Sequence, residues 1–183
     1  MSRIMALAGP PGSGKSTIAR ALGAYGFERV PFAAPLKAMM RGFYEAVGVS
    51  SEVIEAKLNG CLKETSCGFL GGQTPRWAQQ TLGTGWGRDL IALDLWVSAW
   101  RTAALNHIGG GAPGVVADDC RFPNEAAMIR CMGGIVVEVR RPGVFYSGRH
   151  ASEAGGLDVD AVLSNDDDPA VVAARLMDSC PAM

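Results

Sequence analysis

The sequence has no apolar run long enough to cross a membrane, because no segment of its 183 residues approaches the roughly 20 apolar residues that a spanning helix needs. Glycines interrupt the apolar stretch near the N-terminus, which argues against a signal peptide. The formal net charge is -1, so the basic surplus typical of general nucleic-acid binding is missing too. These absences predict a globular cytoplasmic protein that binds neither membranes nor nucleic acids in general.

Patterns for disulfides and structural metals are also missing. The cysteine count of five is odd, and the closest pair, Cys61 and Cys67, has neither a second pair nor matching histidines to complete a zinc site. There is no internal repeat or long charge run, and the hydrophobic fraction of 48% suits one folded domain with its own core. We expect reduced thiols at Cys61, Cys67, Cys120, Cys131 and Cys180.

The most informative segment that is present is Gly9–Thr17, which reads GPPGSGKST. It follows the apolar run Ile4–Ala8 and precedes the helical pattern Ile18–Leu22. This is the Walker A motif, G-x-x-x-x-G-K-[ST], in its strand–loop–helix context; an ordinary glycine-rich turn is the weaker alternative. Glycines let successive backbone N–H groups turn toward phosphate oxygens, and the helix N-terminus adds its dipole. The segment predicts a nucleoside triphosphate site.

Each polar side chain of this loop has an expected role. Lys15 is expected to neutralise the β- and γ-phosphates during catalysis, and Ser16 to offer its hydroxyl to Mg²⁺. The loop residues expected to bind ATP are Gly12, Ser13, Gly14, Lys15, Ser16 and Thr17.

Hydrophobic periodicity and turn residues divide the chain into alternating strands and helices. This alternation predicts a doubly wound, five-stranded parallel sheet covered by helices, with ligands at the carboxyl ends of its strands. Strands are expected at 3–8, 27–30, 114–118, 135–139 and 161–163. Helices are expected at 15–24, 35–47, 51–58, from 75, 89–107, 124–130 and 169–177, with a break at 83–88.

Two of these helices have a predicted buried face. In the helix at 35–47 the apolar stripe is Leu36, Met39, Met40, Phe43 and Val47. In the helix at 89–107 it is mostly Leu90, Leu93, Leu95, Val97, Trp100 and Leu105.

A second dense cluster, DDCRFPNE, spans Asp118–Glu125. A strand that ends in an acid matches the Walker B arrangement, in which a carboxylate holds Mg²⁺ directly or through water. Arg121 lies three residues past the strand, where an acceptor phosphate is expected, and Glu125 either orients Arg121 or contacts the substrate. The local alternative makes Asn124 a helix N-cap and Glu125 a dipole-favoured acid of the first turn.

Over nearly its whole length the sequence resembles the deoxynucleoside monophosphate kinases of tailed bacteriophages. The Thr-Leu-Gly-Thr and Asp-x-Arg-Phe-Pro-Asn-Glu pieces are far more specific than the Walker A motif alone. The matching pieces are Gly9–Thr17, Phe32–Lys37, Thr74–Arg76 with Gln80–Thr84, Trp86–Arg88, Asp119–Glu125, and His150–Glu153 leading to Ala161–Asn165.

The resemblance implies a three-layer α/β/α P-loop kinase that moves the γ-phosphoryl of ATP, with Mg²⁺, to a deoxynucleoside monophosphate (dNMP), giving dNDP and ADP. It implies a single domain with a core (1–34, 108–141 and 161–183), a helical acceptor-binding region (35–107) and a lid (142–160). A homodimer is compatible with the family, and a phage origin would place the protein in the host cytoplasm.

The resemblance also implies roles for individual residues. Catalysis is expected from Lys15, Asp119, Arg121 and Arg141, and Asn165 joins the ATP site. Ser16, Asp118 and Asp119 are expected at the metal, the acids through water; Asp119 is favoured because the family's acid stands two before its arginine. The expected dNMP-binding residues are Lys37, Arg41, Arg76, Trp86, Arg88, Arg121, Glu125, Arg149, His150 and Glu153.

Several alternatives stay open on sequence grounds. Lys37 and Arg41 share a helix face that is equally well explained as a solvated basic surface. Trp96 and Trp100 have the spacing of core residues, whereas Trp86 stands among glycines and is the better candidate for stacking on a base. A dephospho-coenzyme-A kinase or another small-metabolite kinase, a polynucleotide 5′-kinase and a non-catalytic nucleotide sensor remain as rival functions.

Overall fold

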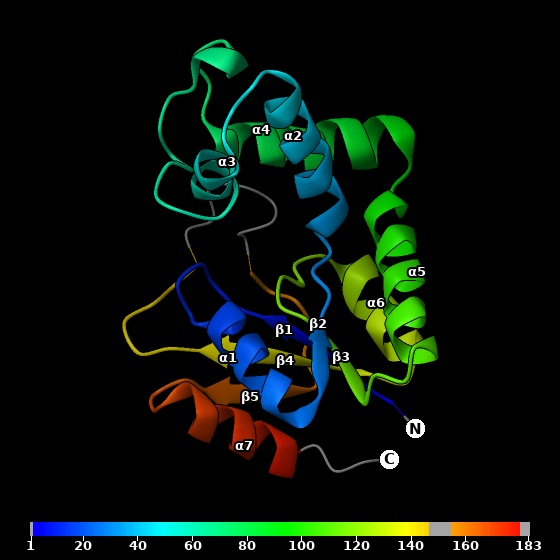
Figure 1. Ribbon diagram of the computed structural model, residues 1–183. Coiled ribbons are helices and arrows are strands. Elements are labelled where there is room, and N and C mark those ends of the chain that lie inside the picture. The colour runs from blue at the N-terminus through cyan, green and yellow to red at the C-terminus, as the bar shows by residue number, and fades with distance from the viewer. Residues whose placement is uncertain (1, 147–154, 180–183) are drawn as a thin grey trace. The chain divides into compact units, whose positions relative to one another are not determined.

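The structure is a computed structural model that describes residues 2–146 and 155–179. It divides into two compact units (Figure 1). The first comprises residues 1–32 and 100–183, and the second comprises residues 33–99. The finer division into core, acceptor-binding region and lid stays a prediction.

A five-stranded, all-parallel sheet forms the centre of the first unit, as predicted. The strand order is β2-β3-β1-β4-β5, so β1 lies in the middle. Ala6 of β1 pairs with Ala117 of β3, and Ala8 pairs with Glu138 of β4. The loops that leave β1 and β3 therefore emerge side by side. The strands are β1 (Arg3–Ala8), β2 (Phe27–Arg29), β3 (Gly114–Ala117), β4 (Ile135–Arg140) and β5 (Ala161–Ser164).

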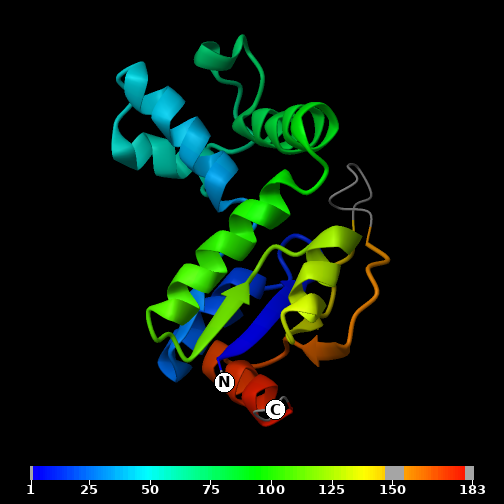
Figure 2. The same cartoon turned by 90° about the vertical axis from the view of Figure 1, so that its right-hand side faces the viewer.

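Helices cover both faces of this sheet (Figures 1 and 2). The connections β1–α1–β2 and β3–α6–β4 run in opposite directions along the sheet, and right-handed crossovers then place α1 and α6 on opposite faces. α7 packs beside α1, and α6 packs on β1 and β4. The helices are α1 (Lys15–Ala21), which continues as the 3₁₀ helix η1 (Leu22–Tyr25), α6 (Pro123–Cys131) and α7 (Pro169–Ser179).

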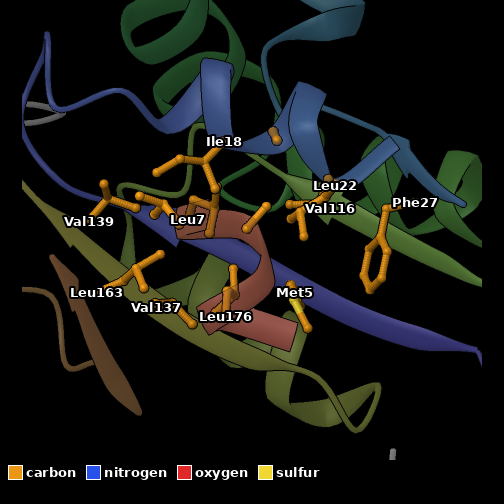
Figure 3. Packing of buried hydrophobic residues seen from close by; sticks show 13 residues of the cluster. Met5, Leu7, Ile18, Leu22, Phe27, Val116, Val137, Val139, Leu163 and Leu176 are labelled. Carbon is orange, nitrogen blue, oxygen red and sulfur yellow. The ribbon is translucent and has the colours of Figure 1, made fainter. Parts of the chain in front are cut away.

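One hydrophobic cluster fixes α1 and α7 on the sheet (Figure 3). Met5 and Leu7 alternate along β1 and so point to one face, where they meet Ile18 of α1 and Leu176 of α7. Each full burial of such a side chain contributes about 1.5–3 kcal/mol. Leu7 and Ile18 have no exposed surface, so the start of α1, and with it the loop before it, rests on a rigid base.

The second unit consists of helices. α2 (Ala34–Ala46) and α3 (Ser51–Leu58) pack together, followed by the short 3₁₀ helix η2 (Gly68–Leu70) and α4 (Pro75–Thr81). The hydroxyl of Thr74 accepts a hydrogen bond from Trp77 N (3.1 Å), so Thr74 is the N-cap of α4. The core of this unit is formed by Met40, Tyr44, Ile54, Leu58 and Cys67.

The predicted apolar stripe of α2 was partly wrong. Leu36, Met40 and Tyr44, four residues apart, form the buried row, because α3 and α4 pack on that row. Phe43 is 43% exposed, and Met39 and Val47 are similarly exposed. Hydrophobicity alone could not indicate which of two adjacent rows would receive the packing.

The glycine-rich segment 83–88 is not a break. It lies inside a π-helix, η3 (Leu82–Ile91), and the helix ends at Ala92, whose backbone is extended. Gly87 has no room for a Cβ because the indole of Trp96 lies against it, and Trp96 Nε1 donates to Gly83 O at 2.7 Å. The glycines therefore provide space for a tryptophan rather than a turn.

α5 (Leu95–Gly109) begins in the second unit and ends in the first. Trp96, Val97, Trp100 and Ala104 are its buried residues, which confirms Trp96 and Trp100 as core. Three leucines predicted to be buried at 89–107, namely Leu90, Leu93 and Leu105, are 76%, 66% and 44% exposed. The prediction failed because the helix was expected to start six residues too early, which put the apolar positions out of phase.

Two further expectations from composition can be compared with the structure. Cys61, Cys67, Cys120 and Cys131 are free thiols, as predicted, and Cys180 lies outside the described residues. In residues 2–146 and 155–179, no helix combines the length and the apolar character that crossing a bilayer requires.

Candidate active site

The Gly9–Thr17 loop connects the end of β1 to the start of α1, as its motif predicts. Lys15 is only 7% exposed, and its Nζ donates to Gly9 O and Pro10 O at 2.7 Å each. A third contact, at 3.3 Å, joins Nζ to Ser13 Oγ. The ammonium group thus closes the loop on itself, while the side chain of Ser16 at the start of the helix is exposed.

Asn165 links this loop to the end of β4 through two hydrogen bonds. Its side-chain Nδ2 donates to Ser13 O at 2.7 Å, and its backbone N donates to Arg140 O at 2.7 Å. Gly14 has φ 94°, and a Cβ at this position would overlap Nδ2 of Asn165. Asn165 therefore lies in the predicted ATP site, where it holds the shape of the loop through a backbone carbonyl.

Asp118 directly follows β3 and is buried at the edge of the sheet next to the loop. Its Oδ2 pairs with Arg29 at 2.8 Å, and its Oδ1 has no hydrogen-bond partner among the described residues. A buried carboxylate oxygen normally has a partner, because losing water without replacement is costly. The free oxygen therefore indicates a place for a further donor or cation. Arg29 belongs to no motif, so no sequence signal pointed to it.

Asp119 has a different partner. Its Oδ1 accepts a hydrogen bond from the backbone N of Phe32 at 2.8 Å. The ring of Phe32 stacks on Trp100 with a centroid distance of 4.8 Å, and Trp100 Nε1 donates to Val30 O at 2.8 Å. Phe32 and Trp100 are the residues at which the chain leaves and re-enters the first unit. Asp119 thus helps to hold Phe32 in place where the chain leaves the first unit.

Glu125 braces the turn that carries Arg121. Its Oε2 accepts from the backbone N of Arg121 at 2.7 Å and from that of Phe122 at 3.1 Å. The N-cap of α6 is Phe122, with Pro123 at the first position, so the expectation that Asn124 is the N-cap was wrong, whereas Glu125 is an acid of the first turn as the same alternative expected. The fixed φ of Pro123 starts the helix one residue before Asn124. Glu125 therefore holds the backbone beneath Arg121.

Charges of both signs converge on Lys15. Burial and the nearby Arg121 guanidinium lower the pKa of Lys15 from 10.5 to about 8, while the carboxylates of Asp118 and Asp119 act in the opposite direction. The structure thus brings together the lysine, two acids and arginine that the sequence predicted as a group. Such a convergence at the carboxyl edge of a parallel sheet is typical of a phosphate-binding active site.

Comparison with known proteins identifies the family of this chain. No protein-family model matches the chain. A protein of Acanthamoeba polyphaga mimivirus, named "Putative deoxynucleotide monophosphate kinase", is 31% identical over 160 residues, which cover 82% of this chain and 80% of the viral protein. The chain belongs to the deoxynucleotide monophosphate kinase family. It is a kinase, and therefore a phosphotransferase.

Two solved structures also align with this kinase. TT1252 from Thermus thermophilus is 18% identical, with a TM-score of 0.49 and coverage of 97% of this chain and 95% of that chain. An unliganded sugar kinase from a Janibacter species is 15% identical, with a TM-score of 0.43 and coverage of 97% and 94%. Similarity at this level does not bear on the substrate.

The kinase has two residues at this edge that sequence reasoning missed. Tyr146 donates its hydroxyl to Glu138 Oε1 at 3.0 Å, and Glu138 also pairs with Arg140 at 2.6 Å. Burial and the Glu138 carboxylate raise the pKa of Tyr146 to about 12, while Arg121 is close enough to act in the opposite direction. Neither Tyr146 nor Glu138 belongs to a motif, so no sequence signal pointed to them.

Each predicted acceptor residue of the second unit contacts a neighbouring residue of the same unit. Lys37 Nζ donates to Asn59 Oδ1 at 2.6 Å, and Arg41 pairs with Glu55 at 2.8 Å. Arg41 is thus paired with a residue of α3, and Lys37 with the C-cap residue of the same helix. Arg76 pairs with Glu64, and Arg88 is buried and donates to Leu93 O at 3.4 Å. Trp86 is 37% exposed and lies beside Trp96 with a centroid distance of 6.2 Å.

The remaining predicted residues follow β4. Arg141 is exposed, and its carbonyl accepts a hydrogen bond from Val144 N at 3.1 Å in a turn. Arg149, His150 and Glu153 lie outside the described residues. Their roles, like that of Arg141, stay predictions.

The lowered pKa of Lys15 predicts that ATP binding depends on pH. Above pH 8 the unliganded enzyme increasingly carries a neutral Lys15, so binding the phosphates requires proton uptake. We expect the apparent affinity for ATP to fall above pH 8, approaching tenfold per pH unit by about pH 9. Calorimetric titration in two buffers of different ionisation enthalpy measures both the affinity for ATP and the number of protons taken up on binding. In Lys15→Arg, which stays charged, the pH dependence should disappear; if it persists, another group causes it.

The Arg29–Asp118 pair predicts a loss of stability. Arg29→Ala leaves a buried carboxylate without its partner, which for a fully buried pair costs about 3–5 kcal/mol. Because the Arg29 side chain is 40% exposed, solvent screens the pair. We therefore expect urea unfolding to show that Arg29→Ala lowers the free energy of unfolding by roughly 2 kcal/mol. In an Asp118→Asn background the same substitution should cost much less. An equal cost in both backgrounds would show that the ion pair is not the cause.

Proposed function

We propose that this kinase transfers the γ-phosphoryl group of ATP to the 5′-phosphate of a deoxynucleoside monophosphate, giving ADP and the deoxynucleoside diphosphate. The observation that carries the proposal is the convergence of Lys15, Arg121, Asp118 and Asp119 beside a Walker A loop. Membership of the deoxynucleotide monophosphate kinase family supports the acceptor class.

The loop supplies the donor site. Its backbone N–H groups and the N-terminus of α1 bind the ATP phosphates, and the amide of Asn165 keeps Ser13 O turned away from them. Lys15 is released from Gly9 O and Pro10 O and moves its charge to the β- and γ-phosphates. The phosphates also restore its proton affinity, since they are anionic.

The residues beside the loop fit a Mg²⁺ ion brought with ATP. Hard oxygen donors are available in the exposed hydroxyl of Ser16 and in Asp118 Oδ1, which is buried and has no partner among the described residues. We assign the metal role to Asp118 in preference to Asp119, whose Oδ1 accepts from Phe32 N. When bound, the ion neutralises charge on the β- and γ-phosphates.

Arg121 acts at the transferring group. Transfer between two phosphates needs no strong base, because the attacking oxygen of the acceptor is already anionic. The barrier consists of charge repulsion and alignment, so cations held in fixed positions carry the catalysis. Glu125 acts as a positioning residue, because its carboxylate accepts a hydrogen bond from the backbone N–H of Arg121 and so holds the turn that carries this arginine.

The test is a panel of four dNMPs and four ribonucleoside monophosphates with ATP and Mg²⁺, read as ADP release coupled to a second enzyme. We expect dNMP-dependent release and its loss in Lys15→Ala. Transfer to dephospho-coenzyme A or to a 5′-hydroxyl oligonucleotide, with none to any dNMP, would replace the proposal by one of those activities. ATP binding without transfer to any acceptor would identify a nucleotide sensor.

A further inference from the structure

A single carboxylate in the first unit holds both ends of the segment that follows β4. This carboxylate belongs to Glu138, which pairs in the sheet with Ala8, the last residue before the Walker A loop. Its Oε2 accepts a hydrogen bond from Arg140 Nε at 2.7 Å, and its Oε1 accepts one from the Tyr146 hydroxyl at 3.0 Å. Residues 140–146, called here the β4 turn, therefore begin and end on the same side chain.

The middle of the β4 turn is held by its own sequence. Residues 141–144 read RPGV, with Pro142 and Gly143 at the two central positions. Val144 N donates to Arg141 O at 3.1 Å, and Gly143 has φ 77°. Proline at the first central position and a positive φ at the second are the features of a type II turn. The backbone of Arg141 is thus fixed from both sides.

The β4 turn lies against the Walker A loop. A Cβ on Gly12 would contact Val144 at 3.9 Å. Asn165 joins the two segments, because its backbone N donates to Arg140 O and its amide donates to Ser13 O, at 2.7 Å each. A displacement of the turn would therefore also displace the loop.

Glu138 also separates the roles of two consecutive arginines. Glu138 and Arg140 are two residues apart on β4, so their side chains lie on the same face of the strand, and they pair at 2.6 Å. Because the Arg140 side chain is 66% exposed, this pair adds little to the stability of the fold. Its contribution is geometric, since the charge of Arg140 holds the turn while the neighbouring Arg141 is exposed.

We propose that Glu138 is a positioning residue of the kinase reaction, which fixes the β4 turn and thereby holds Arg141 beside the phosphates of ATP. The proposal rests on the proposed function for its donor and its acceptor. Groups that are in place before the substrate binds lower the ordering cost of binding and of the transition state. A misplacement of about 1 Å can cost on the order of 10²-fold in rate.

The first experiment removes the two hydrogen-bonded partners of Glu138 in turn. Glu138→Ala should lower kcat about 10- to 100-fold and raise the calorimetric Kd for ATP about fivefold, because both depend on the place of Arg141. Tyr146→Phe removes only the hydroxyl, so it should lower kcat less, and it should add nothing to Glu138→Ala. Glu138→Gln still accepts from Tyr146 but cannot pair with Arg140, and it should recover part of the rate.

Asp160 provides the matched control. Its carboxylate also holds two partners, since it accepts from Arg130 Nε at 3.0 Å and from Val136 N at 2.7 Å. It directly precedes β5 and so lies at the amino edge of the sheet, opposite the Walker A loop. Asp160→Ala should lower the thermal unfolding midpoint and change kcat by less than about twofold. A loss of kcat equal to that of Glu138→Ala would show general loosening of the sheet and overturn the proposal.

The second experiment tests whether Glu138 acts through Arg141. In an Arg141→Ala background, Glu138→Ala should lower kcat by less than about threefold, because the group that it positions is already gone. The full loss in both backgrounds would contradict the proposal, as would a wild-type kcat and Kd in Glu138→Ala.

The Kd for ATP separates this proposal from the proposed function. If wild type phosphorylates no dNMP, the proposed function fails, and the same pair of variants is then compared by calorimetry alone. A fivefold weakening by Glu138→Ala that disappears in the Arg141→Ala background would support the role of Glu138. An equal weakening in both backgrounds, or none in either, would overturn it.

Discussion

Replacing Arg121 by alanine is expected to lower kcat on the order of 10³-fold or more, with a much smaller change in the KM for ATP. Loss of an arginine that acts on the transferring phosphoryl costs this much because its charge is needed most in the transition state. Steady-state kinetics with ATP and the best dNMP of the panel measure kcat and KM separately. Arg121→Lys should recover only part of the rate, because an ammonium cannot reproduce the guanidinium's bidentate geometry.

The fold should survive this substitution. The turn that carries Arg121 is held by hydrogen bonds from backbone N–H groups to Glu125, and these do not involve the guanidinium. We expect the thermal unfolding midpoint to change by only a few degrees. Arg175→Ala, an exposed arginine that pairs with Asp166, is the control and should retain activity within about twofold. Near-normal kcat in Arg121→Ala would remove Arg121 from the active site.

Replacing Gly14 by alanine is expected to weaken ATP binding by more than 100-fold. The new Cβ would collide with the amide of Asn165, which would release Ser13 O and distort the loop whose N–H groups bind the phosphates. In addition, φ 94° is unfavourable for an L-residue by about 1–2 kcal/mol. Calorimetric titration with ATP and Mg²⁺ measures the affinity, and urea unfolding of the unliganded protein measures the strain.

The same loop offers a matched control for the collision. Gly12 also has a positive φ, 84°, but a Cβ there would meet only Val144, at 3.9 Å. Gly12→Ala should therefore show the backbone strain alone and destabilise the unliganded protein less than Gly14→Ala. Adding Asn165→Ala to Gly14→Ala should recover part of the lost stability, because the atom that collides is gone. Equal destabilisation by both alanines would contradict the role given to Asn165.

Local patterns predicted the first unit well because its fold depends on them directly. An apolar run such as β1, with a glycine-rich loop and a helix after it, can bury both faces only inside a parallel sheet. The five strands were correct to within a residue or two, and so was the start of α7, where Ala170 N donates a hydrogen bond to Asp168 Oδ1 at 2.8 Å. In such segments the residues that the hydrophobic pattern predicts to be buried are the ones that the fold buries.

The second unit was predicted less well because its short helices choose their buried faces by mutual packing. The exposed face of α2 and the buried row beside it are similarly apolar, and only the positions of α3 and α4 separate them. Glycines in η3 were taken as a break, whereas they accommodate the ring of Trp96. A one-dimensional pattern does not contain a contact between residues nine positions apart.

From its residues alone, this chain determined a parallel sheet with a phosphate-binding loop at its carboxyl edge, and a cluster of acids and an arginine beside that loop. These follow from spacing along single strands and from the strict demands of the loop on glycine, lysine and serine. Only the tertiary structure decided that Arg29 pairs with Asp118, that Asn165 supports Ser13, and that an apolar face of α2 lines a cavity. The physical reason is that these contacts join side chains that are brought together by packing, and packing energies depend on all the partners at once.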